Sequence, residues 1–292
     1  MGKYLVIRCI LFIVSEDWYF VSHRLHLAKA AINSGCKVAL LSHYTNHRSI
    51  IENAGIEIID WSLKRSSINI FQEIKAIKNI ISSIRQFRPD IIHSVAMKPV
   101  IYSSIASLIV GLENRVFAFA GLGYIFSSKK RSAILLRPLM ELAFRFFLNG
   151  KRTRLILQNK EDHLSLLSAN VINDNNIRLI RGAGIDTTIF SMQYLPTDLP
   201  IIILPSRMLW AKGIKDFINC AKIINNNIKT ARFVLVGTPD NQNPDAIPIE
   251  KLEEWNNRGI VEWWGHQSDM PTVYHQSTIV CLPTSYGEGL PK

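Results

Sequence analysis

The chain has 292 residues, of which 48% are apolar and 20% charged, and this composition excludes an intrinsically disordered protein. Its formal net charge is +11, and the whole surplus lies in residues 1–198, because acidic and basic residues balance in the remainder. The four cysteines are scattered without metal-ligand spacing, which favours free thiols in a reducing cytosol over disulfides or zinc. No stretch reaches the roughly 18 uninterrupted apolar residues of a membrane-spanning helix.

Strand-like and helical segments alternate along the first part of the chain. We expect strands at 6–14, 37–42, 56–59, 91–93, 115–120 and 154–158. We expect helices between them at 22–34, 70–87, 99–108 and 137–149. Such alternation predicts a parallel sheet with helices on both faces.

A second series of elements follows a polar segment that is bracketed by Pro196 and Pro200. Its expected strands are 201–205, 232–237, 261–264 and 278–282, and its expected helices are 214–225, 249–257 and 270–275. The sequence therefore predicts an α/β protein of two Rossmann-like domains, 1–190 and 199–292, whose parallel sheets face a cleft. The second domain is short and ends just after a strand, so we expect it to be incomplete.

Two basic residues follow the first strand of the second domain. Arg207 and Lys212 lie in a loop that opens a helix, at the sheet edge where doubly wound folds bind ligands. Two cations beside a helix N-terminus suit a diphosphate, Arg through its fork and Lys as a point charge. The alternative is a solvated basic loop.

An acidic residue between two glycines follows the last expected strand. Because Glu288 comes after a strand of the same domain, we expect it at the same sheet edge as the basic loop. A carboxylate there repels phosphate, so neutral sugar hydroxyls are its more natural ligands. The alternative is an acid that caps a helix N-terminus.

The first domain carries acidic and aromatic residues directly after its first strand, in the segment EDWYFVSHR at 16–24, which includes Asp17 and His23. Aromatic rings beside acids suit stacking on a sugar and hydrogen bonding to it. The alternative is a helix-capping box with a core Trp. No glycine-rich phosphate loop occurs here, so we expect the nucleotide in the other domain and disfavour a Rossmann-type dehydrogenase or epimerase.

Further acceptor-side candidates follow two later strands of the first domain. His93 and Lys98 flank one strand end and offer acid/base or anion-binding groups, although a lone His at a strand end is more often structural. Gly121 and Gly123 form a tight turn that brings backbone close to a ligand.

Cations and large apolar residues are interleaved in residues 129–154, where Glu141 is the sole acid. An apolar helix studded with cations suits an anionic membrane surface. The alternative is a core helix with solvated basic ends. Nucleic acid is not expected as a partner, since no nucleic-acid-binding motif accompanies the charge.

Together these motifs resemble glycosyltransferase family 4, a group of retaining enzymes with the GT-B fold, and most of all its bacterial surface-polysaccharide branch. The resemblance runs in order over nearly the whole chain. It is carried by EDWYFVSHRLHLAKA, IIHSVAMKPVIYSSIAS, GLGYIF, RGAGIDTTIF, PSRMLWAKGIKDFI, VLVGTPD, VEWWGHQSDMP and LPTSYGEGLPK.

The resemblance implies a hexosyltransferase of O-antigen, lipopolysaccharide or capsule biosynthesis. Such an enzyme moves a sugar, here expected to be an N-acetylhexosamine, from a UDP-sugar to an undecaprenyl-diphosphate-linked acceptor with retention. It implies a peripheral position on the cytoplasmic face of the bacterial inner membrane. Apart from the UDP-sugar donor, no cofactor and no metal are expected.

The resemblance also implies roles for single residues. Arg207 and Lys212 would hold the donor diphosphate. Glu288 would be the catalytic residue that contacts the donor sugar, as the first Glu of the family's E-x(7)-E signature. Gly289 and Leu290 would offer their backbone amides to the sugar and phosphate.

The chain departs from the family pattern in two places. The second Glu of the signature would lie beyond Lys292, and Gly121-Leu122-Gly123 stands where many members place a catalytic-site His. An alternative to the enzyme is therefore a C-terminally truncated, non-catalytic remnant that keeps its membrane docking.

Overall fold

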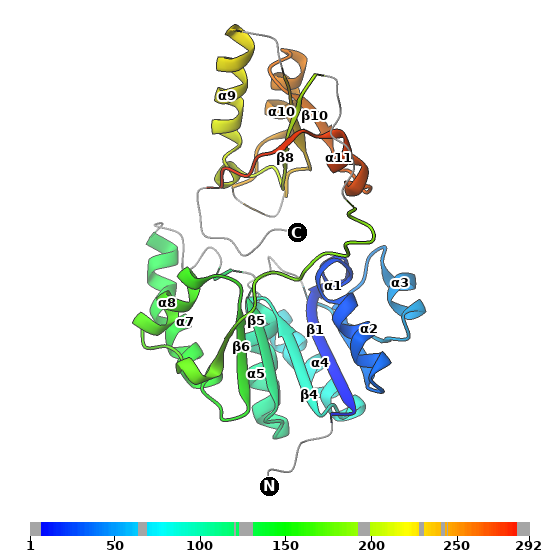
Figure 1. The fold of residues 1–292 in the computed structure, drawn as a ribbon. Helices are drawn as coiled ribbons and strands as arrows, with labels where there is room; N and C mark the ends of the chain where they lie inside the picture. Colours follow the sequence, from blue (N-terminus) through cyan, green and yellow to red (C-terminus); the bar gives the residue numbers. More distant parts are fainter. Residues whose placement is uncertain are drawn as a thin grey trace. The chain divides into compact units, whose positions relative to one another are not determined.

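The computed structural model describes residues 7–63, 69–119, 121–122, 131–191, 199–227, 231–240, 243 and 245–284. These residues form two compact units, one up to Gly184 and the other from Ile185 (Figure 1). The sequence places the domain limits at 1–190 and 199–292, so the observed division comes slightly before the expected one.

Seven parallel strands form the sheet of the first unit, in the order β3-β2-β1-β4-β5-β6-β7. They are β1 (Cys9–Glu16), β2 (Lys37–His43), β3 (Glu57–Asp60), β4 (Ile91–Val95), β5 (Arg115–Phe119), β6 (Thr153–Leu157) and β7 (Ile177–Leu179). The strand order reverses between β1 and β4, and in such sheets ligands bind beyond the carboxyl ends of the strands at that point. The predicted parallel α/β architecture is confirmed.

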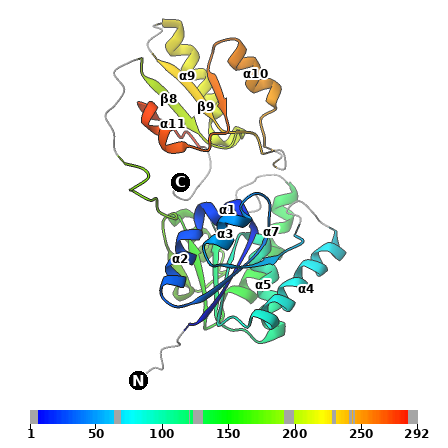
Figure 2. The same ribbon diagram turned by 90° about the vertical axis from the view of Figure 1, so that its right-hand side faces the viewer.

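Helices cover both faces of this sheet because the central strands are largely apolar, and successive side chains of a strand point to opposite faces. Leu11 and Ile13 of β1 belong to one buried core, and Phe12 and Val14 to another. Figure 2 shows α2 and α4 on opposite sides of the sheet. The helices are α1 (Asp17–His23), α2 (Leu25–Asn33), α3 (Arg48–Asn53), α4 (Ile70–Phe87), α5 (Met97–Val110), α7 (Arg131–Leu148) and α8 (Lys160–Ser168).

The structure corrects the sequence around the first helix. The expected single helix at 22–34 is divided at Arg24, whose backbone leaves the helical region (φ −132°, ψ −14°), and the first piece already begins at Asp17. Aromatic residues at 18–20 conceal helical periodicity because they face both the core and solvent. Phe20 is fully buried, whereas Trp18 is 43% exposed.

Short elements were missed by periodicity. They are α3, α8 and β7, the last with only three residues. A helix of six residues, or one whose apolar residues do not share a face, gives no clear 3.6-residue pattern. Strand β4 runs to Val95, so His93 lies inside the strand and not at its end.

Four parallel strands form the sheet of the second unit, in the order β10-β9-β8-β11. They are β8 (Ile201–Pro205), β9 (Arg232–Val236), β10 (Glu262–Gly265) and β11 (Ile279–Val280). The helices are α9 (Ile214–Asn227), α10 (Ile249–Asn257) and α11 (Met270–Gln276), and a 3₁₀ turn, η2 (Trp210–Lys212), precedes α9. Phe217 of α9 packs edge-on against Phe233 of β9, with ring centroids 5.4 Å apart.

Within the described ranges, no helix combines the length and the apolar character that crossing a bilayer requires.

Candidate functional site

Strand β8 delivers Arg207 to the carboxyl edge of the second sheet. Its Nη1 donates a hydrogen bond of 2.9 Å to Oδ2 of Asp240, which follows the neighbouring strand β9. The Arg207 side chain remains 49% exposed, so the ion pair leaves much of the guanidinium accessible. Asp240 therefore orients this cation without burying it.

Lys212 lies at the end of η2, close enough to Arg207 for their charges to interact. Burial, together with the charge of Arg207, lowers the pKa of Lys212 to about 8. The fold thus holds two cations near each other in a partly buried loop. A bound dianion would relieve their repulsion, and this arrangement suits a diphosphate.

The Lys212 loop is packed against the segment that follows β11. Gly213 adopts φ +76°, and a Cβ at this position would collide with the carbonyl oxygen of Pro283. The Thr284 hydroxyl donates to the carbonyl of Ala211 at 3.4 Å. Only glycine permits this close approach, which brings Pro283 and Thr284 beside the basic loop.

Glu288, Gly289 and Leu290 lie outside the described residues. Their predicted roles in catalysis and donor binding stay predictions. The described part of this segment ends at Thr284.

Sequence reasoning missed two acids that shape the basic loop. Asp240 binds Arg207, and Asp245 accepts a hydrogen bond of 2.8 Å from the amide of Ala211. Both follow β9, a strand that ends at the same sheet edge, and this position was the signal that could have revealed them.

In the first unit, Asp17 is fully buried and accepts four hydrogen bonds. The donors are the amides of Trp18, Thr45 and His47 and the hydroxyl of Thr45, at 2.7–3.1 Å. Burial by itself would raise the pKa of Asp17, but these hydrogen bonds outweigh it and lower the pKa below its ordinary value. Asp17 therefore ties the β1–α1 turn to the loop after β2.

The ring of His23 stacks on Tyr19, with centroids 4.3 Å apart and planes within 3°. Trp18, next to them, is 43% exposed, and Glu16 makes no side-chain cap at α1. The alternative of a capping box with a core Trp is therefore wrong. An exposed aromatic surface near the carboxyl end of β1 remains available for stacking.

His93 is 7% exposed and lies against Phe12, with ring centroids 5.1 Å apart. Burial and the charge of Arg24 lower the pKa of His93 to about 3, so its imidazole is neutral at physiological pH. A group with this pKa is poorly matched to general acid/base work near neutrality.

Lys98 lies in the first turn of α5 and forms an ion pair of 2.9 Å with Glu73 of α4. The Tyr102 hydroxyl also donates to Glu73, so this lysine helps to join the two helices. The preceding turn is strained, because Ala96 adopts φ +80° and ψ +165°, a region that is essentially restricted to glycine.

Gly121 lies beside Asp162 of α8, and the amide of the next residue, Leu122, donates to Oδ2 of Asp162 at 3.1 Å. Burial raises the pKa of this carboxyl. Asp162 is a further polar group at the carboxyl end of β5 that the sequence did not indicate. Gly123 lies outside the described residues.

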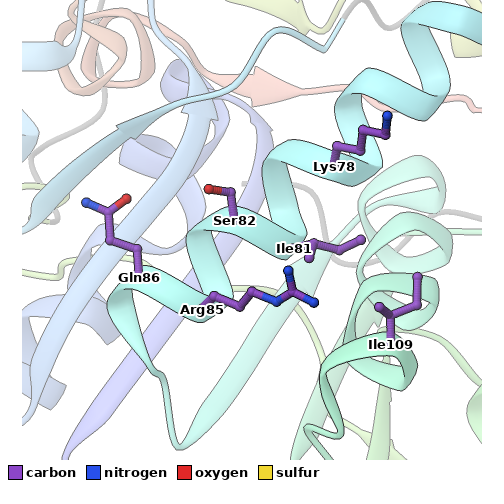
Figure 3. Close-up of a pocket in the computed structure, with 6 residues that line it drawn as sticks. All are labelled: Lys78, Ile81, Ser82, Arg85, Gln86 and Ile109. Atoms are coloured by element: carbon purple, nitrogen blue, oxygen red, sulfur yellow. The ribbon is translucent and has the colours of Figure 1, made fainter.

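A groove of about 590 Å³ lies between α4 and α5, on the helical layer of the first unit (Figure 3). Lys78, Ile81, Arg85 and Ile109 contribute to its lining. None of the predicted site residues lines it. In the part of the chain that the structure describes, no cluster of three or more metal-ligating side chains occurs.

Helix α7 presents an apolar stripe to solvent. Leu135, Leu139, Leu142 and Phe146 are each 62–79% exposed and recur at intervals of three or four residues. On the opposite side of the helix, Phe144 is fully buried and stacks on Phe119 of β5. The alternative of a core helix with solvated basic ends therefore accounts for the buried side of α7 but not for its exposed apolar side.

Two parallel α/β units, with two neighbouring cations at the carboxyl edge of the second, fit the glycosyltransferase class. The chain belongs to the glycosyl transferase 4-like family, whose sequence profile matches residues 9–159. Residues 199–292 match the glycosyl transferases group 1. The predicted family and enzyme class are confirmed.

Two curated relatives act on diphospho-undecaprenol substrates according to their names. N,N'-diacetylbacillosaminyl-diphospho-undecaprenol alpha-1,3-N-acetylgalactosaminyltransferase of Campylobacter jejuni is 26% identical over 285 residues, covering 92% of this chain and 72% of the relative. UDP-Gal:alpha-D-GlcNAc-diphosphoundecaprenol alpha-1,3-galactosyltransferase of Escherichia coli is 24% identical over 238 residues, covering 77% of this chain and 59% of the relative.

Solved structures with the same fold include Anabaena Alr3699/HepE in complex with UDP and glucose, with a TM-score of 0.71 and 14% identity over 97% of this chain and 76% of that one. A glycosyltransferase from Rickettsia africae gives a TM-score of 0.69 and 17% identity, covering 96% and 74%. A UDP-N-acetylglucosamine 2-epimerase gives 0.60 and 10%, covering 94% and 74%. The predicted GT-B fold class is confirmed.

Proposed function

We propose that this protein transfers an N-acetylhexosamine from a UDP-sugar to an undecaprenyl-diphosphate-linked saccharide, with retention, in the synthesis of a bacterial surface polysaccharide. The observation that carries the proposal is that two cations, Arg207 and Lys212, lie close together at the carboxyl edge of the second sheet. The packing of Gly213 against Pro283 supports it, because Pro283 lies five residues before Glu288 in the sequence and contacts the loop that carries Lys212.

The names of the two relatives support the acceptor class, since both contain a diphospho-undecaprenol. One transfers N-acetylgalactosamine and the other galactose, so a UDP-N-acetylhexosamine is the first donor to test. The Anabaena structure holds UDP and glucose, which favours a UDP-sugar for this fold.

In the proposed mechanism, the chemical work of the second unit is to stabilise the leaving UDP. Arg207 and Lys212 neutralise the diphosphate as negative charge develops on it, so no divalent cation is required for that step. Glu288 binds hydroxyls of the donor sugar. The leaving phosphate takes the proton of the acceptor hydroxyl on the face where it departs, and this front-face geometry retains the anomeric configuration.

Lys212→Met tests the donor site. The loss of one charge-assisted hydrogen bond of about 1.5–3 kcal/mol corresponds to a drop in kcat/KM of about 10- to 150-fold. Transfer from UDP-N-acetylgalactosamine, UDP-N-acetylglucosamine and UDP-galactose to a lipid-linked acceptor is measured for each variant. Lys215→Met, an exposed neighbour on α9, is the matched control. Wild-type kcat/KM in Lys212→Met would remove this residue from the site.

We also propose that α7 docks the protein on the cytoplasmic face of the inner membrane, where a lipid-linked acceptor resides. The exposed stripe of Leu135, Leu139, Leu142 and Phe146 supports insertion among acyl chains. Arg145, at the end of the helix, is exposed and adds an attraction to anionic lipids of about 1 kcal/mol. The side chains of 129–134 lie outside the described residues.

Liposome flotation tests this docking. We expect binding to vesicles that contain phosphatidylglycerol, weaker binding to purely zwitterionic vesicles, and loss of flotation in Leu139→Glu. The matched control is Leu164→Glu on α8, which is similarly exposed at 65%. Equal flotation of Leu139→Glu and the wild type would refute a role for α7.

A further inference from the structure

A buried arginine without a carboxylate partner lies at the junction of α1 and α2. Arg24 is 7% exposed, and its Nη1 donates to the carbonyl of His23 at 3.0 Å. Among the described residues, its Nε has no hydrogen-bond partner and no carboxylate acts on its charge. Burial lowers the pKa of Arg24, yet arginine remains protonated in proteins. The fold therefore keeps a buried positive charge that its described residues do not neutralise, which is costly.

Two further polar side chains accompany this arginine. His93 of β4 is 7% exposed, and its Nε2 has no hydrogen-bond partner among the described residues. The hydroxyl of Tyr19 on α1 is buried and likewise has none. The charge of Arg24 acts on both groups. Two unsatisfied polar atoms, from His93 and Tyr19, thus lie near the Arg24 cation, whose own Nε is also unsatisfied.

The packing of aromatic rings explains why these groups meet. Phe20 of α1 packs edge-on against Phe12 of β1 at 5.4 Å, and Phe12 lies 5.1 Å from the ring of His93. Arg24 follows Phe20 by one helical turn, and its amide donates to the Phe20 carbonyl at 2.8 Å. Arg24 and His93 consequently lie on the same side of the sheet.

The cluster borders a part of the sheet that is less completely buried. In register across the strands, Phe12 of β1 pairs with His93, His93 with Val116 of β5, and Val116 with Arg154 of β6. Val116 and Arg154 are half-buried. The main strand contacts of α1, α2 and α3, which share this face, are with β1, β2 and β3 (Figure 1). The side of β5 and β6 is therefore the one from which we expect a ligand to approach the cluster.

A water molecule would satisfy the free polar atoms but would leave the charge of Arg24 unbalanced. A phosphate group satisfies both requirements, because its oxygens accept from the guanidinium fork and carry the opposite charge. A neutral His93 and the Tyr19 hydroxyl can each donate one more hydrogen bond to such an anion.

We propose that Arg24, together with His93 and Tyr19, binds a phosphate group of the lipid-linked acceptor. The first unit then holds the diphosphate of the acceptor, and the second unit holds that of the donor. The assignment to a lipid rests on the proposed function, whereas the anion site rests on Arg24 and its neighbours alone.

Calorimetric titration of the intact protein tests the site. The ligands are farnesyl diphosphate as a short lipid diphosphate, farnesol, inorganic pyrophosphate and UDP. We expect farnesyl diphosphate to bind the wild type, and Arg24→Met to weaken this binding about tenfold or more. UDP is expected to bind both proteins equally. Arg48→Met, an exposed arginine of α3 that pairs with Glu52, is the matched control and is expected to bind like the wild type.

Thermal unfolding separates a binding role from a structural one. Removing a buried charge that lacks a partner is neutral or stabilising, so unliganded Arg24→Met is expected to unfold at the wild-type temperature or above. Farnesyl diphosphate is expected to raise the unfolding temperature of the wild type but not that of Arg24→Met. If Arg24→Met fails to fold, His93→Phe, which replaces one ring by another, gives the same binding readout.

Wild-type affinity for farnesyl diphosphate in Arg24→Met, or in a folded His93→Phe, would overturn the site. Equal, Arg24-dependent binding of pyrophosphate and farnesyl diphosphate would indicate a free anion, and Arg24-dependent binding of UDP would indicate the donor. Either result would overturn the acceptor assignment. None of these measurements needs transfer activity, so a failure of the proposed reaction is recognised separately.

Discussion

Donor binding at Lys212 is expected to take up a proton. Burial and the charge of Arg207 lower the pKa of Lys212 to about 8 in the free protein. A bound diphosphate favours the charged form and raises this pKa again, so the complex binds more protons than the free protein does. The affinity for a UDP-sugar therefore falls as the pH rises through 8.

The magnitude follows from the fraction of Lys212 that is already neutral. With a pKa of about 8 in the free protein and full protonation in the complex, binding takes up about 0.1 proton at pH 7, about 0.5 at pH 8 and about 0.9 at pH 9. The same linkage weakens the apparent affinity about twofold at pH 8 and about tenfold at pH 9.

Isothermal titration calorimetry of UDP-N-acetylgalactosamine in buffers of different ionisation enthalpy measures this uptake directly. The phosphates of a UDP-sugar do not titrate in this range, and the part of the uptake that Lys212→Met loses belongs to Lys212. Lys212→Met is expected to bind more weakly and to lose the uptake, whereas Lys215→Met keeps it. No proton uptake by the wild type between pH 8 and 9 would refute the reasoning.

Three further predictions concern stability, measured by urea unfolding. Asp17→Asn is expected to cost about 2–4 kcal/mol, since an amide cannot accept the four hydrogen bonds that come from Trp18, Thr45 and His47. The lowered pKa of Asp17 stabilises the wild type above about pH 4, and this stabilisation fades as the pH falls further. If the free energy of unfolding of Asp17→Asn fell with pH as steeply as that of the wild type below about pH 4, this role of Asp17 would be contradicted. Ala96→Gly is expected to stabilise by about 1–2 kcal/mol because it relieves φ +80°, and a loss of stability would speak against strain there. His93 is neutral when folded, so the wild type loses about 1.4 kcal/mol per pH unit as the pH falls below about 6.5, and His93→Phe is expected to show a shallower slope.

The sequence predicted the parts of the molecule that repeat. Alternating apolar strands and amphipathic helices indicated both parallel sheets, and helical spacing placed α4 at its observed bounds, Ile70–Phe87. The position of Arg207 and Lys212 after a strand also predicted the sheet edge at which they lie, because parallel strands deliver their following loops to one side.

Contacts between distant residues were beyond such reasoning. Nothing in the segment at 16–24 indicates that Asp17 binds the loop after β2, or that Arg24 is buried over β4, because these contacts depend on the strand order. His93 was expected at a strand end and instead lies inside β4, since Ser94 and Val95 continue the pairing with Ile13 and Val14. The sequence patterns identify surfaces and edges, whereas burial decides which polar residues remain accessible.

The fold alone leaves the reaction open, because a UDP-N-acetylglucosamine 2-epimerase shares it with a TM-score of 0.60. A transferase differs from such an epimerase in its need for a second substrate, the acceptor, which under the proposed function is lipid-linked. The charge distribution fits that need, since the surplus of +11 lies entirely in residues 1–198 while the remainder is neutral. Under the proposed function, the second unit neutralises one diphosphate locally through Arg207 and Lys212. The surplus in the first part then serves an anionic membrane and a lipid diphosphate, both of which a soluble-substrate epimerase would lack.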